Sequence, residues 1–193
     1  MKKHLLLACA SVICTLTAAA LSPIDERVTE VSGAYVRALD DVNFGNEDLN
    51  QRNNVVVTHS ENFPGGGPSV YTTEYYFHIF TDKDNQRHRR LYLIRDTQQI
   101  GAMRYACDYL VDEPTGRLMY IRATEPDLMG SGDCDMLNTQ VFFDKKKPGK
   151  PVRKIVNSVS TDSPALDADL DRRIKTFQCL ANTFANIRPE PRN

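Results

Sequence analysis

The chain has 193 residues, and a leader of about twenty residues would leave enough chain for one domain with a real hydrophobic core. Hydrophobic residues make up 41% and charged residues 25% of it, which excludes a disordered, collagenous or polytopic membrane protein. Without Lys2 and Lys3 of the leader, 22 basic residues stand against 25 acidic ones, a formal charge of −3. Such a chain has no general attraction for phosphates, so we expect no nucleic-acid partner.

The N-terminus has the three parts of a secretory signal peptide. Lys2 and Lys3 form a positive start, residues 5–16 are mostly apolar, and the small residues 18–20 precede Leu21. We therefore expect residues 1–20 to be a signal peptide that is removed. The mature chain would be secreted or periplasmic, an oxidising compartment.

A lipid anchor is the alternative fate for the leader. Leu6-Leu7-Ala8-Cys9 resembles a bacterial lipobox, which would put a lipid on Cys9. The apolar stretch before Cys9 is only four residues long, so we rank the lipid-anchored form below simple export. No later apolar run is long enough to span a bilayer, and we expect no transmembrane segment after leader removal.

Three cysteines follow the leader, which allows one disulfide and one free thiol. Cys107 is in phase with an apolar row of a predicted strand, where an unpaired cysteine acts as a small hydrophobe. Cys134 lies in a polar loop and Cys179 on the flank of the last helix. We predict a disulfide between Cys134 and Cys179; the competing pair is Cys107 with Cys179.

A helix is predicted at the start of the mature chain. Ser22 supplies an N-cap hydroxyl, Pro23 fits the first helical position, and acidic residues follow near the positive end of the helix dipole. Apolar residues then recur at helical spacing until the pattern ends near Asp41. The predicted buried stripe comprises Ile24, Val28, Val31, Tyr35 and Leu39.

The centre of the chain is predicted to be β-structure. A polar loop over 43–54 leads to a short strand at 55–57, and 64–68 is a flexible Gly-rich connection. Beyond it, segments rich in aromatic and β-branched residues alternate with turn residues, so consecutive strands should pair antiparallel as a meander of about five or six strands. These segments are 70–81, 89–96, 101–112, 117–124, 139–144 and 152–157.

A second helix is predicted to close the domain. Asp162 or Ser163 caps it, Pro164 lies in its first turn, and an apolar stripe follows. The stripe comprises Leu166, Leu170, Ile174, Phe177, Leu180 or Ala181, and Phe184. We thus expect a single α+β domain over 21–187, with the C-terminal helix packed on the sheet, and a disordered tail over 188–193.

Two hairpins of the meander repeat one pattern. Each has an apolar or aromatic triplet, an Asp that can cap a turn, a glycine suited to positive φ and a basic residue that starts the return strand. The two units span 109–118 and 141–152. This pattern resembles hairpins of small exported proteins of unknown function from Gram-negative gut bacteria, and more loosely MORN-type repeats. The resemblance covers about a third of the chain and implies an exported β-meander without a specific activity.

Metal and catalytic motifs are weak in this sequence. The mature histidines are His59, His78 and His88, without metal-ligand spacing, and the acidic loop 127–135 lacks the ligand pattern of a calcium site. We expect no metal and no cofactor. Acidic neighbours would also raise the pKa of the Cys134 thiol and suppress its reactivity. A secreted hydrolase with an unidentified acidic pair remains the alternative function.

The two faces of the predicted strands both carry aromatic residues. In 70–81 one face holds Tyr71, Tyr75, Phe77 and Ile79, while the other holds Tyr76, His78 and Phe80. In 89–96, simple alternation predicts Leu91 and Leu93 opposite Tyr92 and Ile94. Two readings stay open: the second face binds a ligand or partner, or the sheet buries it by curling or by taking one helix on each face.

The preferred function is an exported, non-catalytic binding module. It would engage a small apolar ligand or a protein partner through a sheet face or concave pocket that contains Tyr76, His78 and Phe80. The basic segment 86–90 alternates, so Arg87 and Arg89 should share one face and His88 and Arg90 the other. It is either contact surface for an acidic partner or glycan, or a charged strand start that prevents edge association, which we prefer.

Overall fold

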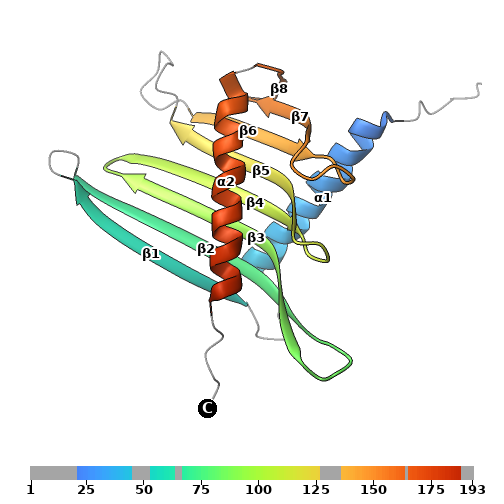
Figure 1. Ribbon diagram of the computed structural model, residues 1–193. Helices are drawn as coiled ribbons and strands as arrows, with labels where there is room; N and C mark the ends of the chain where they lie inside the picture. The colour runs from blue at the N-terminus through green and yellow to red at the C-terminus, as the bar shows by residue number, and fades with distance from the viewer. Residues whose placement is uncertain (1–20, 45–52, 64–66, 127–135, 164, 188–193) are drawn as a thin grey trace, which may run out of the picture.

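The computed structural model describes residues 21–44, 53–63, 67–126, 136–163 and 165–187. Within them an N-terminal helix is followed by eight strands and a C-terminal helix (Figure 1). The helices are α1 (Pro23–Phe44) and α2 (Ala165–Asn186). The strands are β1 (Asn54–Phe63), β2 (Gly67–Thr81), β3 (Arg87–Ile100), β4 (Met103–Asp112), β5 (Arg117–Pro126), β6 (Met136–Phe143), β7 (Pro151–Val156) and β8 (Val159–Ser160).

The strands form one antiparallel sheet in the order β1 to β8, so each strand pairs with its neighbours in sequence. The predicted α+β meander is confirmed, but the strand number of five or six is too low. The extra strands lie at the two edges. β1 extends the predicted 55–57 to ten residues through polar positions, because an edge strand has one side of its backbone in solvent and needs no long apolar run.

Helix α1 begins at Pro23 and is capped as predicted by Ser22, whose Oγ accepts a hydrogen bond from the Asp25 N–H at 3.2 Å. Its buried positions are Val31, Tyr35, Ala38 and Val42, which repeat at four, three and four residues. Ile24, placed by prediction on the same stripe, is 43% exposed because the helix starts beyond the edge of its packing surface.

Helix α2 crosses the strands on the opposite face of the sheet. Leu170, Phe177 and Phe184 are buried, and Ile174 and Leu180 pack beside them, as the predicted stripe requires. Phe177 contacts the Tyr109 ring of β4 at 5.9 Å between centroids. Burial of this stripe is the main attachment of the helix, since each large apolar side chain removed from water contributes about 1.5 to 3 kcal/mol.

The sheet is therefore the middle layer of three, with α1 behind it and α2 in front in Figure 1. The aromatic residues on both strand faces are explained by two cores, one under each helix. The α2 side buries Tyr75, Phe77, Ile94, Tyr109, Ile121, Val141 and Phe143; the α1 side buries Tyr76, Tyr92, Leu93, Leu110, Tyr120 and Phe142. Of the two open readings, one helix on each face is the one observed.

Register shifts interrupt the alternation of faces in three strands, and one of them alters the faces predicted for 89–96. Tyr76 pairs with Leu93 but Phe77 pairs with Leu91, so Tyr92 is an extra residue in β3. Tyr92 and Leu93 consequently both lie on the α1 side, while Leu91 and Ile94 lie on the α2 side. The predicted alternation over 89–96 is wrong for this reason. Equivalent shifts occur opposite Leu110/Val111 and Phe142/Phe143.

The hairpin repeat is visible in the turns that follow these shifts. Asp144 accepts hydrogen bonds from the backbone N–H groups of Lys146 and Lys147 at 2.7 and 3.1 Å, and Gly149 has φ 74°. The β2–β3 hairpin follows the same plan and is a third unit that the sequence pattern missed. There Asp82 accepts from two turn N–H groups, and Asn85, with φ 63°, stands where the other units have glycine.

Candidate functional site

The β2–β3 hairpin is the longest of the sheet and reaches past α1 and the other hairpin turns (Figure 1). Its outer part carries aromatic, imidazole and guanidinium groups on the α1 side of the strands. This group of five residues is called the hairpin face below and comprises His78, Phe80, His88, Arg90 and Tyr92.

Register and stacking bring the hairpin face together. His78 pairs with Arg90 and Phe80 with His88 across the two strands. The His78 ring stacks on Tyr92 with centroids 4.6 Å apart and 20° between planes, and Phe80 stacks on His88 at 5.1 Å and 24°. The Arg90 guanidinium lies 3.7 Å from the Phe80 centroid. Stacking thus forms two neighbouring groups, which the pairing of His78 with Arg90 places side by side in one row, with His78, His88 and Arg90 exposed.

Carboxylates anchor both histidines of the hairpin face. His78 Nδ1 lies 3.1 Å from Glu113 Oε2, and His88 Nε2 lies 2.6 Å from Asp82 Oδ2. The hydrogen bond from His88, helped by the Gln86 backbone N–H, holds the pKa of Asp82 below its usual range. Asp82 is thus charged at neutral pH and fixes the orientation of the His88 ring.

Tyr92 forms the inner end of the row. It is 8% exposed, and burial, reinforced by nearby acidic charges, raises the pKa of its hydroxyl to about 12. The hydroxyl therefore stays protonated at neutral pH. The extra residue in β3 places Tyr92 on the same side as His78, so the register shift is what builds this stack.

On the opposite face of the same hairpin, Arg89 packs against the core and stabilises the fold. Arg89 lies over Phe77 and Phe184, 5.5 and 4.8 Å from the ring centroids, and donates a hydrogen bond to the carbonyl of Ile187 at the end of α2. The predicted division of the basic segment is confirmed by the pairing of Arg87 with Thr81 and of Arg90 with His78, on opposite faces. Arg89 is structural, whereas Arg90 is available to a partner.

The three residues predicted for binding do not form one exposed surface. Tyr76 is 7% exposed and buried beneath α1, so it cannot contact a partner directly. His78 and Phe80 lie on the hairpin face. The sequence analysis did not include Arg90 and Tyr92 in the site. The short turn between the two strands could have indicated Arg90, because it pairs His78 with the basic start of the next strand.

A buried polar cluster lies between α1 and the sheet. The Tyr35 hydroxyl donates to Asp108 Oδ2 at 2.5 Å, and Arg95 Nε donates to Asp108 Oδ1 at 3.0 Å. Burial and the Asp108 charge raise the pKa of Tyr35, so its hydroxyl remains a donor. The buried Asp108 carboxylate thus has hydrogen-bond donors for both of its oxygens. Because one donor comes from α1 and the other from β3, the cluster fixes the position of α1 on the sheet.

A second polar cluster lies beneath α2. Arg173 binds Asp169 and Glu125 at 2.6 and 3.1 Å, and its guanidinium is 3.8 Å from Cys107 Sγ. Burial raises the pKa of the Cys107 thiol to about 11, so it is protonated at neutral pH. The Arg173 guanidinium bridges the two carboxylates, an arrangement that joins α2 to β5, and Arg172 also pairs with Asp169.

Asp96 is a half-buried carboxyl on the α2 side. It accepts a hydrogen bond from Thr73 Oγ1 at 2.8 Å, and burial raises its pKa above the ordinary value. A carboxyl with a higher pKa in the folded than in the unfolded chain stabilises the fold most at low pH, and this contribution is lost as the pH rises through the folded pKa.

We therefore expect Asp96→Asn to raise the urea midpoint at pH 7, because the amide removes a half-buried charge and still accepts a hydrogen bond from Thr73. The difference in urea midpoint between Asp96→Asn and the wild type should become smaller as the pH falls toward about 4, the ordinary range of an Asp pKa. Urea titrations at several pH values measure this. A lower midpoint for Asp96→Asn at pH 7 would contradict the assignment.

Cys107 and Cys179 are free thiols in the structure, the first buried and the second exposed. The competing disulfide between them is therefore not formed. Cys107 packs in the core under α2, as its strand phase predicts. Cys134 lies outside the described residues, and its pairing with Cys179 stays a prediction.

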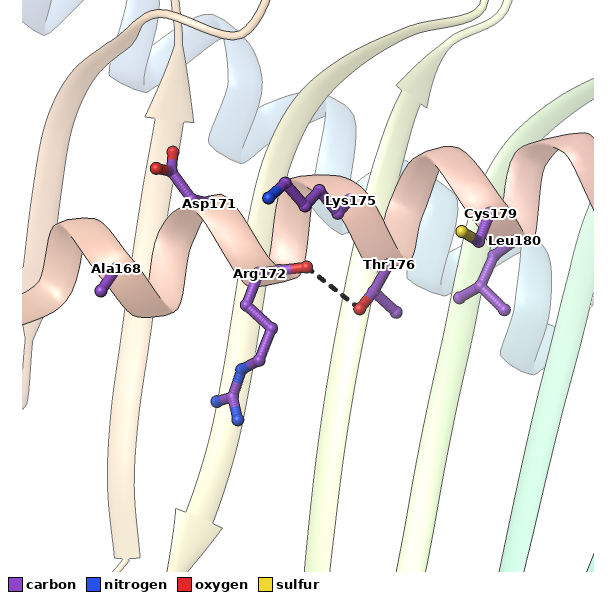
Figure 2. Close-up of a pocket in the computed structure, with 7 residues that line it drawn as sticks. All are labelled: Ala168, Asp171, Arg172, Lys175, Thr176, Cys179 and Leu180. Atoms are coloured by element: carbon purple, nitrogen blue, oxygen red, sulfur yellow. Dashed lines mark hydrogen bonds between the residues drawn. The ribbon is translucent and has the colours of Figure 1, made fainter.

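An open depression of about 600 Å³ runs along the outer surface of α2 (Figure 2). Its lining residues are Ala168, Asp171, Arg172, Lys175, Thr176, Cys179 and Leu180. All come from one helix, and the long charged side chains point outward in Figure 2. This surface lacks the enclosing apolar walls that a site for a small apolar ligand requires.

Among the described residues, no group of three or more His, Cys, Asp or Glu side chains is placed to hold a metal ion. The acidic loop 127–135 lies outside those residues. Neither helix that the structure describes is both long and apolar enough to cross a membrane.

No family model, characterised protein or solved structure matches this chain significantly. The resemblance to exported hairpin proteins therefore has no support from these comparisons.

Proposed function

We propose that this chain is an exported, non-catalytic binding module that engages an acidic protein partner through the hairpin face. The observation that carries the proposal is the exposed row of stacked aromatic and cationic groups on a hairpin that reaches beyond both helices. Aromatic residues and Arg are enriched at protein interfaces and dominate their binding energy.

Charge supports an acidic partner. Residues 79–90 carry four basic side chains and two acidic ones, Asp82 and Asp84. Of the basic residues, Arg90 lies on the hairpin face, whereas Arg87 and Arg89 lie on the opposite face of the strands. The mature chain as a whole is slightly acidic, so this local excess of positive charge is a distinct feature of the hairpin. Such a patch favours encounter with a negatively charged surface and gives a salt-dependent association rate.

A protein partner fits the site better than a small apolar ligand. Phe80 is only half-buried, and Arg90 and His88 pack against its ring. A ligand site on this sheet face would need an exposed Tyr76, but Tyr76 lies under α1. Flat, aromatic and charged surfaces bind macromolecules, whereas small apolar ligands need concave sites.

Site-specific photo-crosslinking in the native host tests this function. A benzoylphenylalanine in place of Phe80 should form one defined adduct with an acidic protein on irradiation. The same probe in place of Lys146, an exposed residue of the β6–β7 turn, is the matched control and should not form it. Equal adducts from both positions, or none from position 80, would overturn the proposal.

A further inference from the structure

The two edges of the sheet differ greatly. β8 at one edge has two residues, whereas β1 at the other has ten. β1 pairs with β2 over all ten positions without a register shift. Natural edges are protected by short length, Pro, Lys or bulges, because unpaired backbone N–H and C=O groups accept another strand. Residues 54–62 contain no Pro, Lys or Arg, and every side chain there except Val55 is exposed.

The hydrogen-bond pattern shows which backbone groups of β1 point away from the sheet. The Phe77 N–H donates to the Asn53 carbonyl at 3.1 Å, so odd residues of β1 face β2 and even residues face outward. On the next strand pair, the Gly101 N–H donates to the Pro68 carbonyl, which agrees with this alternation. Thr58, Ser60 and Asn62 therefore present their backbone groups to solvent.

The second half of β1 is complementary to itself. An antiparallel pair with its two-fold axis at Ser60 sets Ser60 against Ser60, Thr58 against Asn62, and His59 against Glu61. His59 Nε2 already lies 2.8 Å from Glu61 Oε1 within the chain. Across the axis, two such pairs form a square in which each imidazole adjoins two carboxylates.

Neighbouring registers lack this match. An axis at His59 sets His59 against His59 and Val57 against Glu61, and an axis at Thr58 sets Val57 against His59. The Ser60 register is thus selected by charge and polarity. In Figure 1 this half of β1 lies away from α2 and from α1, so neither helix blocks the approach of another strand.

We propose that β1 is a self-association edge that pairs residues 58–62 with the same residues of a second copy, forming a continuous sheet across a two-fold axis. This goes beyond the binding function of the hairpin face and does not depend on it, because the edge lies at the opposite end of β2. The contact is small, so the dimer is weak and forms with rising concentration.

Charge swaps test the register. Sedimentation equilibrium at about pH 6, where imidazole groups carry charge, should show a dimer for the wild type between about 10 µM and 1 mM. His59→Glu and Glu61→His, each alone, should lower the association constant about tenfold or more, because like charges then meet across the axis. Mixing the two variants should restore association, since each Glu then meets a His of the other chain.

The mixture separates contacts between chains from contacts within a chain, because the internal His59–Glu61 pair stays broken in both variants. Ser60→Pro is a second test: it removes an outward N–H and leaves the bonds to β2 intact. It should abolish the dimer at an unchanged urea midpoint. A monomeric wild type at 1 mM, a mixture no tighter than the single variants, or a dimeric Ser60→Pro would overturn the proposal.

Discussion

Replacing Phe177 with Ala is expected to destabilise the domain by about 3 to 5 kcal/mol. The ring is 7% exposed, packs on Tyr109 and lies at the centre of the stripe that attaches α2 to the sheet. Its removal leaves a cavity between two layers that cannot close without moving the helix. Urea unfolding followed by circular dichroism measures the change.

Gln178→Ala is the matched control, since Gln178 is exposed on the same turn of α2. It should shift the free energy of unfolding by no more than about 0.5 kcal/mol. If Phe177→Ala unfolded at the wild-type urea concentration, the docking of α2 through this face would be wrong.

Asp108→Ala should have an effect of similar size on the other side of the sheet, about 3 to 5 kcal/mol. The substitution leaves the half-buried Arg95 guanidinium without its carboxylate and removes the acceptor of the Tyr35 hydroxyl. Uncompensated charge in a partly dry layer is costly, and α1 loses the contact that orients it. The free energy of unfolding at neutral pH is the measurement.

Tyr35→Phe separates the charge effect from the hydrogen bond. It deletes one donor while Asp108 keeps its bonds to Arg95, so the loss should be about 0.5 to 1.5 kcal/mol. An Asp108→Ala variant no less stable than Tyr35→Phe would show that the ion pair does not stabilise the α1 layer.

The local elements of the fold could be predicted from the sequence, whereas its layers could not. The cap at Ser22, the stripe of α2 and the turn aspartates are local signals, and each is observed. Which helix covers which sheet face depends on contacts between distant segments, such as Tyr35 with Asp108. Aromatic residues on both faces of β2 were compatible with either an open or a covered face.

Only part of the candidate site could be predicted, because the alternation of strand faces fails at one residue, Tyr92. His78 and Phe80 follow the simple period of two, but the extra residue Tyr92 shifts the facing strand and completes the row. A single sequence carries no reliable signal for such a shift. Tyr76 was assigned to the binding surface for a different reason: it does share a strand face with His78 and Phe80, but α1 covers that part of the face.

We propose that the exposed residues of the hairpin face, His78, His88 and Arg90, bind the partner and are not needed for the fold. With the protein crosslinked at position 80 as ligand, calorimetry on Arg90→Glu should show at least about a tenfold loss of affinity, or 1.4 kcal/mol. Its unfolding free energy should fall by no more than about 1 kcal/mol, the value of an exposed cation–π contact. Arg87→Glu makes the same charge change on the opposite strand face and should bind within about threefold of wild type. Equal losses for both variants, or no loss for Arg90→Glu, would contradict the account.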